Sequence, residues 1–404
     1  MGHSRGYLSD FFDGVAIKRL SVVEADAKRS NQHEFNGVEA LKKIMGVERQ
    51  DKLPTKFMWV ADEEDDRITS PGFLTWYDSR ENHPTRSEYR LYFPSNLVLS
   101  NAVAGDLVFF CRQKNGHMLT IVVPQKSSME MQLLWLFGID DPGTNFESTG
   151  FSGNSDVRLG FAARFILDEI GLESEEPEDN FLDSILEKFG PGFPQTSVFS
   201  AFARETLKDV SPVDDPDHAL IAWMQHEERL FRTLERHQLA ERLTQGFILT
   251  DGPDVDGFIS FSLSVQNRRK SRVGRAFENH LEAILQQHKI RYERGALTEN
   301  RARPDFLFPG SKEYQDRDFS TEKLFMLGVK TTCKDRWRQV TSEAKKIERK
   351  HLLTLEPGIS EFQTDEMRSH GLQLVVPEEL HETYQAKQQS WLINLKEFIN
   401  IVSH

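Results

Sequence analysis

Two short apolar runs in the last third of the chain place the tightest constraint on its fold. The first, FLF, follows Pro304 and Asp305, and the second, FMLGV, ends at Lys330. Runs of this length with polar boundaries predict neighbouring strands of a buried sheet. Each strand then carries a charged residue at its end, so we expect Asp305 and Lys330 to lie close together.

A second carboxylate, Glu278, lies on a helix predicted over residues 271–288. Two carboxylates and a lysine at one edge of a sheet can hold a hydrated divalent cation and a polarised water against a phosphate. A Pro-Asp dipeptide followed at a distance by a lysine also occurs by chance, and then marks a turn and a solvated side chain. Taken singly, these residues therefore fit either a nuclease site or an ordinary surface.

A basic run lies immediately before that predicted helix. Five basic side chains and no acid fall within ten residues: Arg268, Arg269, Lys270, Arg272 and Arg275. Such clustering favours a polyanion. The net charge of −13 does not oppose this, because residues 140–219 alone hold 18 acids and 5 bases. That acidic segment is either a solvated connector or a cover over a basic cleft.

Three longer strings make the interpretation more specific. SVQNRRKSRVGRAFE, ARPDFLFP and VKTTCKDRWRQ resemble the catalytic domain of EcoRII-type restriction endonucleases, members of the PD-(D/E)xK nuclease superfamily, and the resemblance covers most of residues 220–385. The usual second carboxylate lies two residues before the lysine, where this chain has Gly328. The resemblance implies that Glu278 replaces it. Asp305 and Glu278 are then Mg²⁺ ligands, and Lys330 positions the attacking water.

The same resemblance implies roles for further residues. Tyr314 and Lys334 match positions near the active site, although a packed loop tyrosine and a surface lysine explain them equally well. The basic run matches the specificity segment of the family, which implies DNA contacts from four residues: Arg268, Arg269, Lys270 and Arg272.

Residues 1–139 are predicted to form a mainly β domain. Short runs rich in β-branched and aromatic residues alternate with polar or Gly/Pro turns, which favours a small barrel. Its polar loops either face water or read base edges. IKRL, YDSR and TRSEYR resemble the effector-DNA-binding pseudobarrel domain of EcoRII-type enzymes. That resemblance implies DNA contacts from His33, Arg80, Arg86, Glu88 and Arg90.

The predicted protein is therefore multidomain. Residues 1–139 form the mainly β DNA-binding pseudobarrel, residues 140–192 an acidic linker with short helices, and residues 193–404 an α/β restriction-endonuclease-like domain with a central mixed sheet flanked by helices. The resemblance implies a type IIE restriction endonuclease that makes Mg²⁺-dependent double-strand breaks in DNA at a CC-GG-type or CCWGG-like site. It also implies a homodimer through the C-terminal domain and a second DNA copy bound at the N-terminal domain as allosteric effector.

Other features narrow the functional class. No apolar run approaches the ~18 residues that span a bilayer, and the start shows no signal-peptide pattern. The two cysteines, Cys111 and Cys333, are interpreted as reduced core thiols of a cytoplasmic protein. No Walker loop is present, so no nucleotide cofactor is expected. The alternative function is a catalytically inactive, sequence-specific DNA-binding regulator whose nuclease-like half serves for dimerisation.

Overall fold

A computed structural model describes residues 7–25, 33–62, 67–151, 159–173, 181–250 and 252–403. The chain divides into two compact units, one within His3–Ser174 and Pro357–Thr364, the other within Glu175–Glu356 and Asp365–His404. Most of the acidic stretch at residues 173–180 lies outside the described residues. The predicted domain boundaries after residues 139 and 192 stay predictions.

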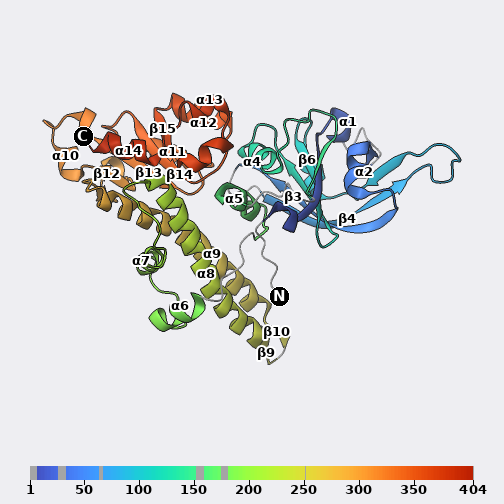
Figure 1. The fold of residues 1–404 in the computed structure, drawn as a ribbon, viewed down its shortest axis with the longest axis horizontal. Coiled ribbons are helices and arrows are strands. Elements are labelled where there is room, and N and C mark those ends of the chain that lie inside the picture. Colours follow the sequence, from blue (N-terminus) through green and yellow to red (C-terminus); the bar gives the residue numbers. More distant parts are fainter. Residues whose placement is uncertain are drawn as a thin grey trace. The chain divides into compact units, whose positions relative to one another are not determined.

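An eight-stranded sheet forms the first unit, in the order β2-β5-β4-β3-β7-β6-β1-β8 (Figure 1). Its neighbours are antiparallel except for the parallel pair β3 and β7. The strands are β1 Phe12–Arg19, β2 Glu34–Gly37, β3 Gln50–Val60, β4 Arg67–Asp78, β5 Tyr89–Tyr92, β6 Leu107–Gln113, β7 Met118–Val123 and β8 Glu147–Gly150. The helices are α1 Val22–Ala25, α2 Glu39–Met45, α3 Leu97–Asn101, α4 Ser128–Phe137 and α5 Phe161–Glu169.

The sheet of the first unit curls strongly. Phe35 on edge strand β2 packs against Phe146, which immediately precedes the opposite edge strand β8, with ring centroids 6.2 Å apart. Long twisted strands curl in this way when apolar residues near both edges can share one core. A curled mixed sheet is therefore the observed architecture, and the pseudobarrel fold stays a prediction.

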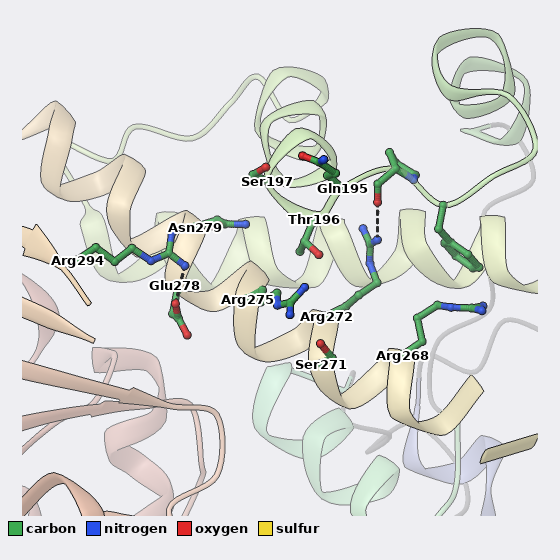
Figure 2. A pocket seen from close by; sticks show the side chains of 12 residues that line it. Gln195, Thr196, Ser197, Arg268, Ser271, Arg272, Arg275, Glu278, Asn279 and Arg294 are labelled. Carbon is green, nitrogen blue, oxygen red and sulfur yellow. Dashed lines mark hydrogen bonds and ion pairs between the residues drawn. The ribbon is translucent and has the colours of Figure 1, made fainter. Parts of the chain in front are cut away.

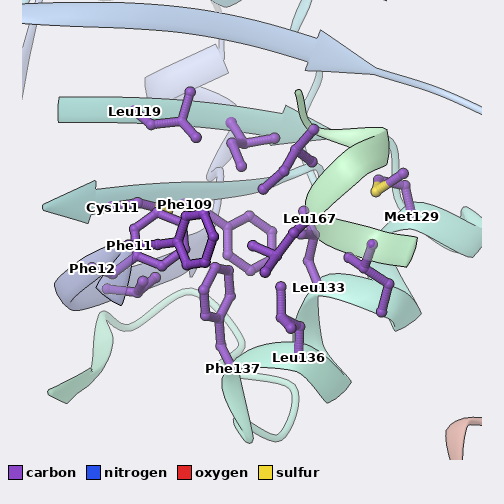
Figure 3. Packing of buried hydrophobic residues seen from close by; sticks show 14 of the residues in the cluster. Phe11, Phe12, Phe109, Cys111, Leu119, Met129, Leu133, Leu136, Phe137 and Leu167 are labelled. Atoms are coloured by element: carbon purple, nitrogen blue, oxygen red, sulfur yellow. The ribbon is translucent and has the colours of Figure 1, made fainter. Parts of the chain in front are cut away.

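Apolar side chains cover both faces of that sheet. Along β6, Phe109 joins one buried cluster and its neighbour Phe110 joins the other, because successive side chains of a strand point to opposite faces. Helices α4 and α5 cover the face that carries Phe109, where Leu133, Phe137 and Leu167 complete the cluster (Figure 3). Burial on both faces explains why the sequence of β6 is a continuous apolar run.

The second unit is built on a five-stranded sheet in the order β11-β12-β13-β14-β15. The first two pairings are antiparallel and the last two are parallel, so the sheet is mixed. Its strands are β11 Glu293–Arg294, β12 Phe306–Phe308, β13 Phe325–Lys330, β14 Lys350–Thr354 and β15 Leu372–Val375. The α/β architecture with a mixed sheet agrees with the prediction for this part of the chain.

The two long helices α8 and α9 run beside each other in the second unit (Figure 1). The remaining elements of the chain are α6 Leu182–Phe189, α7 Thr196–Thr206, α8 Pro216–Gln245, β9 Ile248–Leu249, β10 Gly252–Pro253, α9 Val255–Gln287, α10 Ser311–Gln315, α11 Trp337–Ser342, α12 Glu361–Ser369, α13 Ala386–Gln389 and α14 Leu395–Val402. The Asp215 carboxylate caps α8 by accepting from His218 N at 3.0 Å, and Asp254 caps α9 by accepting from Gly257 N at 2.9 Å.

Two details of the sequence prediction were wrong. The helix that carries Glu278 begins at Val255, so the basic run lies within it rather than before it. Arginine and lysine are good helix formers, and the Asp254 cap starts the helix well before the apolar spacing becomes regular. The short strands β2 and β8 were missed, because neither carries a run of apolar residues. Among the described residues, no helix is both long and apolar enough to cross a membrane.

Candidate active site

Asp305 and Lys330 meet at the edge of the central sheet of the second unit. Antiparallel pairing sets Phe306 of β12 opposite Leu327 of β13 and so brings the ends of the two strands together. Asp305 Oδ2 accepts from Lys330 Nζ at 2.9 Å and from Val329 N at 2.7 Å. Both side chains are partly exposed, at 21% for Asp305 and 23% for Lys330. The expected carboxylate–lysine pair is therefore present, anchored by a main-chain hydrogen bond and open to solvent.

Gly328 explains why the second carboxylate is not on β13. A Cβ atom at this position would lie only 2.8 Å from Cγ2 of Val340, on helix α11. Real Cβ atoms do not approach other carbons this closely, so no acidic side chain fits here while α11 packs on the strand. The space that the usual carboxylate would occupy is taken by this helix.

Glu343 supplies a carboxylate that sequence reasoning missed. It is the C-cap residue of α11, the same helix that packs on Gly328. Burial raises the pKa of the Glu343 carboxyl, the charge of Asp305 raises it further, and Lys330 and Lys350 oppose the shift. The Glu343 carboxyl therefore lies within electrostatic reach of the Asp305–Lys330 pair. Its sequence context, TSEAKKIER, is mostly polar and offers no signal that distinguishes this glutamate from its neighbours.

Glu278 belongs to a different cluster. Its carboxylate pairs with the Arg294 guanidinium at 2.5 Å, and the same guanidinium donates to Glu282 at 2.9 Å and to Asn279 at 3.1 Å. Arg294 lies on β11, where it pairs with Phe306, the residue after Asp305. Glu278 is thus one strand away from the Asp305–Lys330 pair and is held by an arginine.

Tyr314 and Lys334, the other two predicted active-site residues, lie on α10 and in the loop after β13. Tyr314 is buried, and its hydroxyl donates to Glu299 at 2.6 Å. Burial and this hydrogen bond raise the pKa of the Tyr314 hydroxyl. Lys334 follows β13 with a positive φ of 36°, a strained conformation for a lysine. Tyr314 is therefore placed as a packing residue, whereas Lys334 sits in the loop that leaves the site.

The side chains of the basic run on α9 do not form one continuous surface. Arg269 pairs with buried Glu235 at 2.6 Å, whereas Arg272 is itself buried and donates to the Pro194 carbonyl at 3.0 Å. Arg268 stacks on the Phe193 ring, 4.3 Å from its centroid. Arg268 and Arg272 line one cavity together with Arg275, and Lys270 is exposed (Figure 2).

The C-terminal part of this chain is similar in sequence to known proteins. Residues 231–399 match the family model described as EcoRII C terminal. Over 186 residues the chain is 44% identical to the type II restriction enzyme EcoRII of Escherichia coli, a match that spans 46% of this chain and 45% of that protein. The chain thus spans less than half the length of that relative.

Two solved structures show a weaker likeness. Metal-depleted Ecl18kI in complex with uncleaved, modified DNA is 18% identical with a TM-score of 0.43, covering 56% of this chain and 84% of that one. A PspGI–substrate DNA complex is 13% identical with a TM-score of 0.39, covering 57% and 94%. Both values are too low to support an argument about this chain.

Asp305 and Glu343 are the two carboxylates at the strand edge that would hold a metal ion. In the described ranges, no group of three or more His, Cys, Asp or Glu side chains is arranged to hold a metal. Asp305 and Glu343 still fit Mg²⁺, because this ion keeps several waters and needs only one or two carboxylates from the protein.

The five residues predicted to bind DNA in the N-terminal part are only partly brought together. Glu88 bridges two of them, through Arg80 at 2.6 Å and through an ion pair with Arg90. Arg90 also donates to Asn36 on the paired strand β2. Arg86 is exposed in the preceding loop, and His33 contacts Ser95 at 3.3 Å. Lys28 and Arg29, in the other predicted loop, lie outside the described residues.

Proposed function

We propose that the chain is a type II site-specific deoxyribonuclease that hydrolyses DNA at the edge formed by β12 and β13. The observation that supports this most strongly is the Asp305–Lys330 pair with Glu343 beside it, inside a segment of the EcoRII C terminal family. A carboxylate pair and a lysine at one open sheet edge suit metal-assisted phosphodiester hydrolysis.

In this proposal each residue has a separate task. Asp305 and Glu343 hold Mg²⁺, which when bound stabilises charge on the phosphate oxygens and acidifies a bound water. Lys330 keeps one N–H on Asp305 and has two further N–H donors for the attacking water and the phosphate. The hydrogen bond from Val329 N fixes Asp305 Oδ2, which keeps the carboxylate in place before DNA binds.

The role of Glu278 as the second Mg²⁺ ligand remains an alternative within the same function. Its pairing with Arg294 favours a positioning role instead, because the guanidinium competes with a cation for Glu278 Oε2. Arg294 also joins Glu278 to the strand beside Asp305. Glu278 can therefore support the active site without binding metal.

The finer features of the proposal follow from the EcoRII resemblance. The site cut is a CC-GG-type or CCWGG-like sequence, and the enzyme is a homodimer through its C-terminal domain, since two-fold symmetry gives one active site per strand. The N-terminal unit binds a second DNA copy as effector. In that unit Glu88 pairs with both Arg80 and Arg90. One carboxylate cannot neutralise two guanidinium groups, so this cluster keeps positive charge that can bind a phosphate.

A plasmid assay tests the proposal. Full-length protein is incubated with plasmid DNA with and without Mg²⁺, and the fragment ends are sequenced. We expect Mg²⁺-dependent discrete fragments whose ends share one short sequence. Specific DNA binding without cleavage in Mg²⁺ would instead favour the inactive regulator.

A further inference from the structure

A cavity of about 710 Å³ lies between helix α9 and the start of helix α7, in the second unit. Its α9 side carries Arg268, Arg272 and Arg275, and its α7 side carries Thr196 and Ser197 (Figure 2). The whole lining contains four arginines and one acidic residue. That acid, Glu278, is already paired with the fourth arginine, Arg294. The cavity therefore presents a net positive charge to any ligand.

The start of α7 adds donors of the right kind. This helix has 11 residues, and its N-cap Gln195 makes no side-chain capping hydrogen bond. The N–H groups of Val198 and Phe199 both turn back to the Gln195 carbonyl, which leaves the first-turn N–H groups of Thr196 and Ser197 at the cavity. Uncapped first-turn N–H groups and the helix dipole favour an anion.

Arg272 adds buried positive charge to the lining of the cavity. The residue is only 8% exposed, yet within the described part of the chain its Nε and Nη2 atoms have no hydrogen-bond partner. The carboxylate of Glu227 lies 4.0 Å from Nη2, too far for a hydrogen bond. The rings of Phe199 and Phe231 pack on the guanidinium, with centroids at 4.8 and 5.0 Å. The charge of Arg272 is therefore only loosely compensated by Glu227, and it adds to the positive potential of the cavity.

The cavity also adjoins the candidate active site. Arg294, at its end, pairs with Phe306 on β12, and the next residue, Gly295, donates its N–H to the Asp305 carbonyl at 3.1 Å. With the scissile phosphate at Asp305, a neighbouring phosphate of the same strand would lie near the Arg294 end of this cavity. An exposed cation at the mouth, Arg275, is placed to meet its backbone.

We propose that this cavity binds one internucleotide phosphate of the strand being cut, close to the scissile phosphate, an inference that rests on the proposed nuclease function. The α7 N-terminus and Arg275 contact the phosphate oxygens, and Arg268 and Arg272 supply the surrounding positive charge. The basic run then holds the strand in register through its backbone, a role separate from any reading of base edges.

Methylphosphonate scanning tests this inference. Full-length protein is mixed, without divalent metal, with duplexes that carry the cut site and one neutral methylphosphonate at successive positions, and the dissociation constant is measured by fluorescence anisotropy. For the wild-type protein we expect one position within two nucleotides of the cut to weaken binding about tenfold. For Arg275→Ala the same neutral linkage should cost less than about twofold, because the contact is already lost.

Two further variants make the result specific. Arg275→Lys keeps the charge and should recover most of the tenfold effect. Arg236→Ala removes an exposed arginine on α8 that does not line the cavity, and should keep the wild-type pattern. If Arg275→Ala and the wild type show an identical pattern, the inference is overturned. If the wild type still cleaves DNA with Mg²⁺ in that case, the proposed function stands. Absence of both cleavage and site-specific binding in the wild type would overturn both.

Discussion

Two clusters in the second unit combine a cation with two carboxylates, and they differ in how the charges are satisfied. On α9, the Arg294 guanidinium donates to both Glu278 and Glu282. At the strand edge, Lys330 donates a hydrogen bond to Asp305. The pKa of the nearby Glu343 carboxyl is raised by burial and by the charge of Asp305. In the first cluster the Arg294 guanidinium pairs with both carboxylates. In the second the single Lys330 ammonium leaves part of the negative charge uncompensated. This difference favours the strand edge as the metal-binding site and the α9 cluster as its support.

Removing Asp305 should have the largest effect. We expect Asp305→Ala to lower the Mg²⁺-dependent cleavage rate at least about 10³-fold, because the carboxylate anchors both Lys330 and the metal. The rate is measured on a plasmid with one site. The Asp305→Asn variant keeps an acceptor for Val329 N and should be equally inactive. The DNA affinity of both variants should stay within about threefold of wild type. Cleavage at near the wild-type rate by either variant would contradict the assignment of Asp305 to the active site.

The two glutamates provide the sharpest contrast. We expect Glu343→Gln to lower the cleavage rate about 10²-fold or more, as loss of a charged group at the reacting phosphate does. Glu278→Gln should lower it only about tenfold, as loss of a residue that positions others does. The reverse order would restore Glu278 as the second metal ligand.

A smaller effect is expected in the N-terminal unit, where one carboxylate holds two arginines. Arg86→Ala combined with Arg90→Ala should reduce, about three- to tenfold, the stimulation of cleavage by an added oligonucleotide that carries the site. Cleavage without the oligonucleotide serves as the baseline in the same samples. Arg49→Ala removes another arginine of the same unit, one that is not paired with Glu88, and is the control. Equal stimulation in all three proteins would contradict effector binding at this cluster.

The sequence predicted the strands of the active-site edge because their apolar runs are short, buried and bounded by charged residues. Asp305 and Lys330 could be placed from that pattern alone. Glu343 could not, because its position depends on α11 packing against Gly328, a contact between segments with no shared periodicity. The burial of Arg272 was equally hidden, since a basic run is ordinarily a solvated surface and only the three-dimensional packing of Phe199 and Phe231 encloses it.

The dependence of cleavage on Mg²⁺ concentration tests the central claim most directly. If Asp305 and Glu343 hold the metal, Glu343→Gln should require at least about tenfold more Mg²⁺ for half-maximal cleavage, because one of two anionic ligands is neutral. Glu278→Gln should keep the wild-type requirement and lose only maximal rate. An unchanged Mg²⁺ requirement in Glu343→Gln, with a raised one in Glu278→Gln, would contradict the account.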